Sequence, residues 1–409
     1  MASGDPIVIV GSGQAGGWAA RTLRQEGHEQ PIVMIGEEPH PPYERPPLSK
    51  SVLVGAAPAE STHLFPAAAW QALAIERFFE VRAVAIERDR HRIHLSDGRS
   101  LPYARLLLAT GGRPRELTIP GAGLPGIHYL RTIADSLSLA AEVRPHGRLL
   151  VVGGGWIGLE VAAAARRRGM DVVLVEAANQ LCGRALAPDI AGHIERMHRD
   201  QGVDIRLNCA VSRFEGTMRV ERAQLTDGAA TEVSAAVIGI GIAPNCELAA
   251  AAGIAADNGI MVDEHGRTSD PDIFAVGDVA NHPNAFVGRR IRLESWENAQ
   301  NQAIHAAKAM LGKAAAPYAE VPWFWSDQYD TNVQLIGLPQ AWDRTATRGD
   351  RAGGSFLVCY FKDGRLQGAV GINSGRDLKL TRRLMQANVP VDPDRIADPA
   401  IRVQDLLKK

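Results

Sequence analysis

Two glycine-rich stretches have the residue types and the spacing of a phosphate-binding turn. Residues 7–16 read IVIVGSGQAG, and residues 149–158 read LLVVGGGWIG. In each stretch an apolar strand leads into a G-x-G-x-x-G pattern that opens a predicted helix. The first glycine permits the tight bend, the second lets a pyrophosphate approach bare backbone, and the third lets the helix pack on the strand. The glycines are Gly11, Gly13 and Gly16 in the first turn and Gly153, Gly155 and Gly158 in the second.

An acidic residue follows each turn at the distance that dinucleotide binding requires. Glu37 and Glu176 stand about 20 residues after the last glycine of their turns. A carboxylate at this place can accept hydrogen bonds from ribose hydroxyls. One such pattern alone is weakly specific, but two complete copies predict two bound dinucleotides. A resident flavin and an exchangeable nicotinamide would let a hydride pass between the two sites.

The elements that position these turns recur in the same order. Each turn belongs to a strand–helix–strand unit, which predicts a parallel sheet. The remainder, from about residue 317, has strand-like runs at 333–338, 355–361 and 366–371 and a basic helix near 376–387. We therefore predict an α/β protein with two Rossmann-like domains, as in glutathione reductase, and a C-terminal α+β domain. Within the first two, alternating hairpin stretches are expected near 81–98 and 219–228, and buried strands at 106–111 and 236–242.

The composition bounds the class of protein. A chain of 409 residues exceeds one hydrophobic core, so two or three domains are expected. The formal net charge of −1 gives no indication of nucleic-acid binding, and no apolar run reaches the ~20 residues that span a bilayer. The N-terminal MASGDP leads directly into a strand without a signal-peptide pattern, so we expect a cytoplasmic protein.

Cysteine and histidine usage gives no indication of a metal centre or a disulfide relay. The four cysteines are far apart and form no C-x-x-C motif, and the twelve histidines show no metal-ligand spacing. We therefore expect no metal. No cysteine precedes Cys182, so the proline-rich stretch at 39–50 carries no thiol. That stretch holds five prolines and is predicted to lack regular structure.

Several further motifs resemble a known family. The chain is similar to the two-dinucleotide-binding flavoprotein reductases, and within them to NADH-dependent ferredoxin reductases of bacterial ring-hydroxylating dioxygenases and some cytochrome P450 systems. The phrase SWENAQNQA looks most like the phenylpropionate dioxygenase type, and the whole is putidaredoxin-reductase-like. The motifs are PYERPPLSK at 42–50, LLLATGGRPR at 106–115, GIGIAPN at 239–245, IFAVGDV at 273–279, ESWENAQNQA at 294–303 and PWFWSDQY at 322–329.

The resemblance implies an FAD site around the first turn. Lys50 would stand beside the flavin with Glu160 near it, and these two are the expected catalytic residues. Asp278 would contact the ribityl chain, although it could also cap a helix. The FAD-binding residues implied are Gly11, Gly13, Ala15, Gly16, Glu37, Arg45, Lys50, Ala83, Ala109, Arg131, Asp278 and Trp296.

The resemblance likewise implies an NADH site around the second turn. Glu160 would face the nicotinamide, and Gly241 and Ile242 would lie near its carboxamide. Arg184 either reaches the adenosine side or is a solvated arginine. The NADH-binding residues implied are Gly153, Gly155, Ile157, Gly158, Glu160, Glu176, Arg184, Gly241 and Ile242.

The activity implied is that of an FAD-dependent NADH:ferredoxin oxidoreductase. Its partner would be a [2Fe–2S] ferredoxin, with a Rieske type favoured over one held by cysteines alone, and the protein would be a monomer or weak homodimer. The ferredoxin would feed an aromatic-ring-hydroxylating dioxygenase or, as the alternative, a bacterial cytochrome P450. An NADH oxidase or peroxidase and a redox-sensor flavoprotein are the competing interpretations. The expected domains are 1–115 with 236–316 for FAD, 116–235 for NADH, and 317–409. Docking is expected to use Arg289, Arg290, Arg292, Lys379, Arg382 and Arg383.

Overall fold

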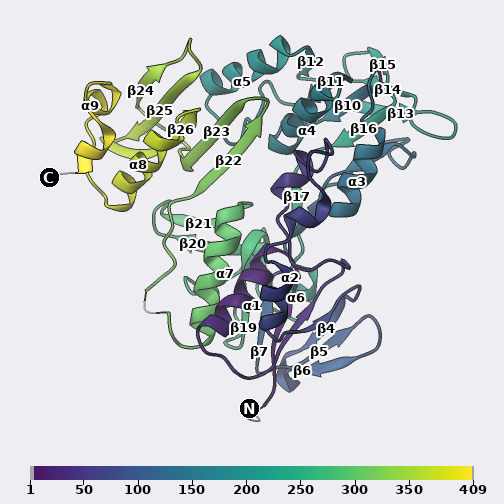
Figure 1. The fold of residues 1–409 in the computed structure, drawn as a ribbon, viewed down its shortest axis with the longest axis vertical. Coiled ribbons are helices and arrows are strands. Elements are labelled where there is room, and N and C mark those ends of the chain that lie inside the picture. The colour runs from purple at the N-terminus through teal and green to yellow at the C-terminus, as the bar shows by residue number, and fades with distance from the viewer. Residues whose placement is uncertain (1–3, 315, 408–409) are drawn as a thin grey trace.

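The protein consists of three units, each built on a five-stranded sheet. We describe it from a computed structural model, in which the structure describes residues 4–314 and 316–407. Figure 1 shows the first unit below, with the second and third units side by side above it. Within the described ranges, no helix has both the length and the apolar character needed to cross a bilayer.

The first unit is a parallel sheet buried on both faces. Ile7 and Ile9 pack against α1 (Gln14–Gln25) and α7 (Trp296–Met310), whereas Val8 and Val10 face the opposite side. That side is covered by an antiparallel sheet of β4 (Ala83–Glu87), β5 (Arg92–Leu95) and β6 (Ser100–Pro102). The parallel order is β19 (Ile273–Ala275), β7 (Arg105–Leu108), β1 (Ile7–Val10), β2 (Ile32–Ile35) and β3 (Glu76–Phe78).

Shorter elements complete the first unit. The helix α2 (Ala67–Ala72) lies outside the sheet, and α6 (Glu247–Ala251) packs beside β4. A small sheet has the order β18 (Ile260–Met261), β20 (Ala280–Asn284) and β21 (Arg289–Arg292). Because β19 follows most of the second unit in the chain, the first unit is assembled from two separate segments.

The second unit repeats this plan, which confirms the predicted pair of Rossmann-like units. Leu149 and Val151 pack on the face with α4 (Trp156–Arg167) and α5 (Pro188–Asp200). The other face is covered by the antiparallel strands β13 (Val211–Glu215), β14 (Arg222–Leu225) and β15 (Ala230–Glu232), while α3 (Ile133–Glu142) flanks β9. The parallel order is β12 (Val203–Leu207), β11 (Asp171–Glu176), β10 (Arg148–Val152), β16 (Ala235–Ile238) and β9 (Ile127–Tyr129).

The strand expected at 236–242 is two strands. It breaks after β16 because Gly241 takes a left-handed φ of +102°, and β17 (Ile242–Pro244) then pairs antiparallel with β8 (Gly112–Pro114). Since β16 pairs with β10, it lies in the second sheet, so the boundary predicted before residue 236 is wrong at this strand. The other domain limits stay predictions.

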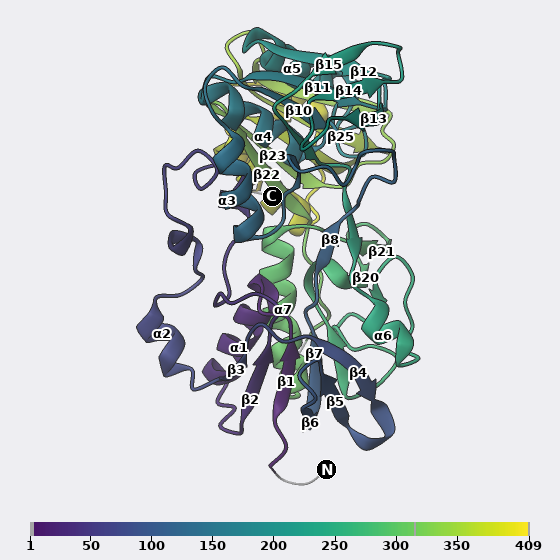
Figure 2. The same ribbon diagram turned by 90° about the vertical axis from the view of Figure 1, so that its right-hand side faces the viewer.

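The third unit is an antiparallel sheet between helices and the second unit. One face packs on α8 (Gly375–Gln386) and α9 (Pro393–Ala397), and the other face packs into the core of the second unit through Val333, Phe356 and Val370. Figure 2 shows the third unit behind the second. The order is β22 (Trp323–Gln328), β23 (Thr331–Gly337), β26 (Arg365–Ile372), β25 (Ser355–Lys362) and β24 (Arg344–Asp350).

The proline-rich stretch contains regular structure, contrary to expectation. Residues Pro46–Ser49 form a short 3₁₀ helix that begins with both prolines. Proline is tolerated in a first helical turn because its fixed φ suits the helix and no N–H is needed there. This helix sets the direction of Lys50, the residue that follows it.

Candidate active site

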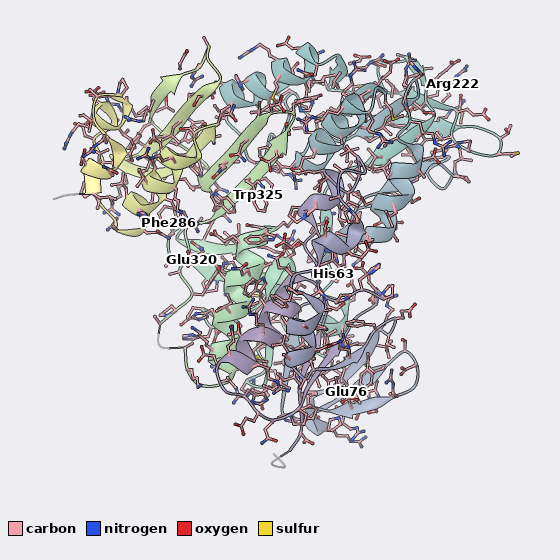
Figure 3. All side chains as sticks on the ribbon, viewed as in Figure 1. His63, Glu76, Arg222, Phe286, Glu320 and Trp325 are labelled. Carbon is pink, nitrogen blue, oxygen red and sulfur yellow. The ribbon has the colours of Figure 1, made fainter. Side chains whose placement is uncertain are left out.

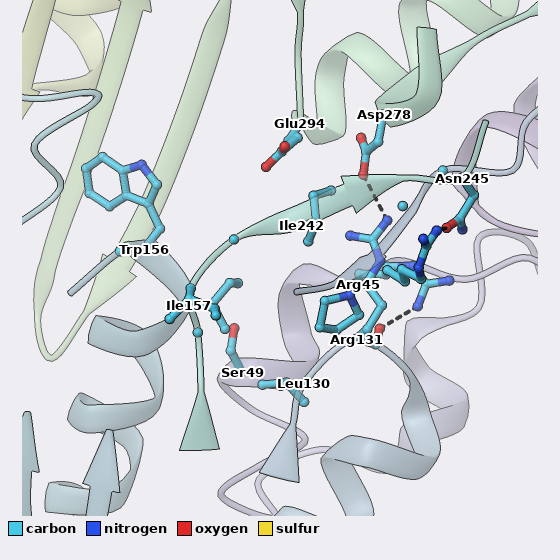
Figure 4. Close-up of a pocket in the computed structure, with 18 of the residues that line it drawn as sticks. Arg45, Ser49, Leu130, Arg131, Trp156, Ile157, Ile242, Asn245, Asp278 and Glu294 are labelled. Atoms are coloured by element: carbon cyan, nitrogen blue, oxygen red, sulfur yellow. Dashed lines mark hydrogen bonds and ion pairs between the residues drawn. The ribbon is translucent and has the colours of Figure 1, made fainter. Parts of the chain in front are cut away.

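One continuous cavity of about 1990 Å³ extends from the first glycine turn to the second. Ligand cavities usually measure about 300–1,000 Å³, so this one has room for two dinucleotides. Figure 4 shows part of its wall. Residues of all three units line the cavity, and Phe324, Trp325 and Trp342 are those of the third unit. The predicted residues on the wall are Gly11, Gly13, Ala15, Glu37, Arg45, Lys50, Ala83, Ala109, Arg131, Asp278, Trp296, Gly153, Gly155, Ile157, Glu160, Glu176, Arg184, Gly241 and Ile242.

The first turn has the geometry that its glycines predict. Gly11 has φ +116°, and a Cβ there would stand 2.2 Å from the carbonyl oxygen of Ala109. A Cβ on Gly16 would stand 2.0 Å from the Gly11 oxygen, so Gly16 serves helix packing and does not line the cavity. A Cβ on Gly13 would meet no described atom within 4 Å. Open space beside Gly13, at the start of α1, fits a pyrophosphate.

The second turn matches the first. A Cβ on Gly153 would stand 2.5 Å from the Gly239 oxygen, and one on Gly158 would stand 2.1 Å from the Gly153 oxygen. Gly158 therefore also serves packing and lies off the cavity wall. Beside Gly155 the nearest described atom would be 3.9 Å away. This turn too leaves space for a pyrophosphate at a helix start, here that of α4.

The two acidic residues differ in what they contact. Glu37, after β2, is 64% exposed and forms an ion pair of 3.1 Å with Arg82. Glu176, at the end of β11, accepts hydrogen bonds from the backbone N–H of Gly154 at 2.6 Å and of Ala178 at 2.8 Å. These bonds fix the Glu176 carboxylate against the glycine turn itself, while its place on the cavity wall keeps it available to a ribose.

A polar cluster joins the first unit to the segment after β9. Arg131 forms an ion pair of 2.9 Å with Asp278 (Figure 4). Arg45 donates to the Arg131 backbone oxygen and forms an ion pair of 3.0 Å with Glu38. Among the described residues, the buried Arg131 Nε has no hydrogen-bond partner. This unsatisfied donor beside the first turn fits a ligand with phosphate and hydroxyl acceptors, as FAD has.

Lys50 and Glu160 meet between the two turns. Lys50 Nζ lies 2.7 Å from Glu160 Oε2, although the residues belong to different units. Glu160 is only 4% exposed, and Oε2 also accepts a hydrogen bond of 2.5 Å from the Ser49 hydroxyl. The two side chains are thus in direct contact, and their catalytic role stays a prediction. The buried Glu160 carboxylate is therefore held by the hydroxyl of Ser49, the last residue of the 3₁₀ helix, and by the ammonium of Lys50, the residue that follows.

The remaining predicted residues lie around this pair. Ile157, in the first turn of α4, is 43% exposed toward the cavity. The Arg184 guanidinium lies 3.4 Å from the place of a Cβ on Gly241, which sets it where the second unit meets β17. Ala109 directly follows β7 and lies beside Gly11, and Ala83 lies on the cavity wall.

Several residues outside the predicted FAD and NADH sets also line the cavity, and one of them, Trp325, belongs to the PWFWSDQY motif. Trp325 of β22 lies on the wall, stacks on Trp323 with ring centroids 5.0 Å apart, and meets Trp296 edge-on at 5.8 Å. Figure 3 shows Trp325 where the third unit approaches the first. Cys182 and Cys209 also line the cavity, after β11 and β12. The pKa of the Cys182 thiol is raised, first by burial and then by the carboxylates of Glu176 and Glu160.

Not all of the expected docking cations are available. Arg382 is 15% exposed and donates two hydrogen bonds of 2.7 Å to Glu297, and Arg292 is 9% exposed and paired with Glu294. These two arginines hold the fold together, so their assignment to docking is wrong. Arg289, Lys379 and Arg383 are exposed. Across residues 4–314 and 316–407, no group of three or more potential ligands is placed to hold a metal.

Comparison with known proteins agrees with this arrangement. The chain is 43% identical over 407 residues to the anthranilate 1,2-dioxygenase system ferredoxin–NAD(+) reductase component of Burkholderia cepacia, covering 99% of this chain and all of that protein. The fold matches putidaredoxin reductase in its covalent complex with putidaredoxin, with a TM-score of 0.95, 39% identity and 98% coverage of both chains. It also matches the ferredoxin reductase for the CYP199A2 system of Rhodopseudomonas palustris, with a TM-score of 0.94, 36% identity and coverage of 98% and 99%.

Two family descriptions account for nearly the whole chain. The pyridine nucleotide-disulphide oxidoreductase family matches residues 5–303, which contain both glycine turns and the Lys50–Glu160 pair. The reductase C-terminal family matches residues 323–407, which form the third unit. The chain therefore belongs to the pyridine nucleotide-disulphide oxidoreductases, and within them to the members that carry a reductase C-terminal domain.

Proposed function

We propose that this protein is an FAD-dependent NADH:ferredoxin oxidoreductase that feeds an aromatic-ring-hydroxylating dioxygenase. The observation that carries the proposal is the single cavity that joins two dinucleotide turns, with the Lys50–Glu160 ion pair between them. Bound FAD would supply the chemistry that accepts two electrons from NADH and releases them singly. The name of the Burkholderia relative supports the dioxygenase assignment.

The residues around the first turn would hold FAD. Open backbone at Gly13 would accommodate the pyrophosphate, and the Glu37 carboxylate would accept hydrogen bonds from the ribose hydroxyls. Arg45 and Arg131 offer cationic donors, and Asp278 an acceptor, to the middle of the ligand. Ala15, Ala83, Ala109 and Trp296 supply apolar wall, and Gly11 and Gly16 shape the turn.

The residues around the second turn would hold NADH. Gly155 would face the pyrophosphate, Glu176 would bind the adenosine ribose, and the exposed Ile157 would supply an apolar contact to the dinucleotide. Gly241 and Ile242 border the nicotinamide end, and Arg184 lies beside them. Glu160 holds the Lys50 ammonium where both cofactors would meet, so that this cation can stabilise negative charge as it develops.

The absence of a thiol at the flavin side favours an external electron acceptor. Among the described cysteines, the two that line the cavity follow strands of the second unit, and Pro46–Ser49 carries none. Electrons would then leave past the Trp296–Trp325 contact toward a [2Fe–2S] ferredoxin. We infer a Rieske-type cluster from the dioxygenase-type motifs, a cytoplasmic location, and a monomer or weak homodimer.

One observation favours a second candidate. The structural match to the ferredoxin reductase of the CYP199A2 system has a TM-score of 0.94. A ferredoxin that feeds a cytochrome P450 would receive its electrons through the same site. The two candidates differ in the terminal oxygenase and share the reductase reaction.

The decisive experiment measures electron transfer to a ferredoxin. Purified protein should be yellow, and NADH should bleach it in the absence of oxygen. NADH oxidation with cytochrome c as final acceptor should then depend strongly on an added [2Fe–2S] ferredoxin. Colourless protein that FAD cannot reconstitute contradicts the proposal. Peroxide-dependent turnover would indicate an NADH peroxidase. Slow NADH oxidation at a rate that does not depend on any added acceptor would indicate a redox sensor.

A further inference from the structure

The Glu160 carboxylate is held from the third unit as well as from the first. Ser326 of β22 donates a hydrogen bond of 2.6 Å to Glu160 Oε1, while Ser49 and Lys50 contact Oε2. Ser326 is completely buried. Each oxygen of the carboxylate therefore has a donor, and the donor to Oε1 comes from a unit that contributes no glycine turn.

Ser326 begins a buried polar chain that runs away from the cavity. Gln328 Nε2 lies 3.0 Å from Ser326 Oγ, and Gln328 Oε1 lies 2.9 Å from His198 Nε2. His198 Nδ1 lies 3.4 Å from the Tyr329 hydroxyl. Gln328 and His198 are also fully buried, so the chain crosses from β22 to α5 of the second unit without passing through solvent.

Chemistry fixes the direction of every hydrogen bond in this chain. A carboxylate paired with Lys50 only accepts, so the Ser326 hydroxyl must donate to it. Ser326 Oγ then accepts from the Gln328 amide N–H, which turns the amide oxygen toward His198. His198 therefore carries its proton on Nε2 and accepts at Nδ1 from Tyr329. The burial that lowers the pKa of His198 keeps its ring neutral, as this arrangement needs.

We propose that Ser326 and Gln328 are positioning residues that fix the Glu160 carboxylate, and through it Lys50, in the geometry needed for electron transfer from NADH. All donors in the chain point toward Glu160, so each bond polarises the next in the same sense. The third unit thus completes the site between the two turns. This inference rests on the proposed function, because it assigns a role within that reaction.

The test separates reduction by NADH from every later step. Anaerobic mixing with NADH, without ferredoxin, gives the limiting rate constant of flavin bleaching and the apparent Kd for NADH. In Ser326→Ala the limiting rate should fall about 10-fold, because a charged acceptor loses its donor, while the Kd stays within about twofold. Reoxidation by ferricyanide should be unchanged. The control Thr381→Val removes a buried hydroxyl of the third unit that donates to the Asp377 backbone oxygen, and should keep all values.

A double-mutant cycle tests whether Gln328 acts through Ser326. Gln328→Met alone should slow bleaching about threefold, and it should have no further effect in the Ser326→Ala background. A crystal structure of Ser326→Ala should show the Glu160 carboxylate turned away from its present Oε1 position. This readout needs no turnover.

Specific outcomes would overturn the inference. A bleaching rate in Ser326→Ala within twofold of wild type, an unmoved Glu160, or an equal effect of Gln328→Met in both backgrounds would each do so. If Ser326→Ala fails to fold, Gln328→Met alone provides the test. Its limiting rate of flavin bleaching must then still fall, while its apparent Kd for NADH stays unchanged. Wild-type protein that NADH does not bleach would contradict the proposed function instead, and the crystal structure would still decide the position of Glu160.

Discussion

Arg131 Nη2 lies 2.9 Å from Asp278 Oδ2, which ties the segment after β9 to the segment after β19 across the cavity. Both side chains are largely buried, with 22% and 16% exposed. Arg131 Nε has no hydrogen-bond partner among the described residues. Arg131 can therefore keep its ion pair with Asp278 and also donate a hydrogen bond to a bound ligand.

We expect Asp278→Asn to weaken FAD retention about 10-fold, because the amide lacks the charge that orients Arg131 and accepts less strongly from a ribityl hydroxyl. The FAD content after dialysis and the Kd of reconstitution measure this. Asp270→Asn is the matched control, because Asp270 forms a comparable ion pair of 2.7 Å with Arg88 in the same unit, away from the cavity. Equal FAD loss in both variants would contradict a ligand role for Asp278.

Glu176 should set the preference for NADH over NADPH. Its carboxylate is fixed by Gly154 and Ala178, so a 2′-phosphate would meet a negative charge that cannot turn away. We expect at least ~100-fold preference in kcat/KM, which corresponds to about 2.7 kcal/mol. Glu176→Ala combined with Ala177→Arg should erode it.

The control for this prediction is Asp171→Ala, at the exposed opposite end of β11. It should keep the preference for NADH. Equal use of both cofactors by the wild type would show that Glu176 is only a residue at the end of a strand.

Replacing all four cysteines with Ser or Ala should leave ferredoxin-dependent turnover within about twofold. The thiol of Cys182 has a raised pKa and contacts the Gly154 oxygen at 3.6 Å, so at pH 8 it stays protonated and poorly nucleophilic. Iodoacetamide should therefore modify the half-buried Cys246 before Cys182, as peptide mass spectrometry would show. Loss of turnover in a folded, FAD-loaded variant would indicate a thiol relay.

Acid should destabilise the protein partly through His282. Burial lowers the pKa of this ring to about 4, and it is 1% exposed. The unfolded chain takes up the proton near pH 6.5, so stability falls as the pH decreases from there to about 4. Over this pH range the free energy of unfolding should fall by about 3 kcal/mol less in His282→Gln than in the wild type. Urea titrations at pH 7 and pH 4.5 measure it, and parallel pH profiles for both proteins would refute the assignment.

Ferredoxin docking should depend on the exposed cations of α8. Lys379→Glu and Arg383→Glu should raise the apparent KM for ferredoxin, and the wild-type value should rise with salt because exposed charges are screened over ~10 Å at 0.1 M. Arg382→Gln should instead lower the melting temperature, since it breaks the buried contact to Glu297. A KM that does not respond to salt would remove the electrostatic account.

The glycine turns could be predicted because their reason is local. Gly11 and Gly153 need a left-handed backbone, and Gly16 and Gly158 lie too close to a carbonyl oxygen for any side chain. Both constraints require glycine at fixed positions, so the G-x-G-x-x-G spacing shows them in the sequence. The same holds for Glu176, whose place follows from the length of one strand–helix–strand unit.

Contacts between distant segments could not be predicted in this way. Ser326 is one serine in a strand of mixed polarity, and only the packing of the third unit on α4 brings it to Glu160. Arg382 has the same residue type as the exposed Arg383 beside it, yet the helix turns it inward to Glu297. The prediction of no regular structure in the proline-rich stretch was wrong because proline is excluded from the middle of a helix but is tolerated in its first turn.

The late position of β19 in the chain has a consequence for synthesis on the ribosome. When residues 1–250 have emerged, the second sheet has all five of its strands, but β7 still presents an unpaired edge where β19 will bind. The helix α7, which packs on α1, is also still missing. The second unit can therefore complete its sheet first, and the first unit completes its sheet afterwards, so the glycine turn at 153–158 stands on a finished sheet before the turn at 11–16 does.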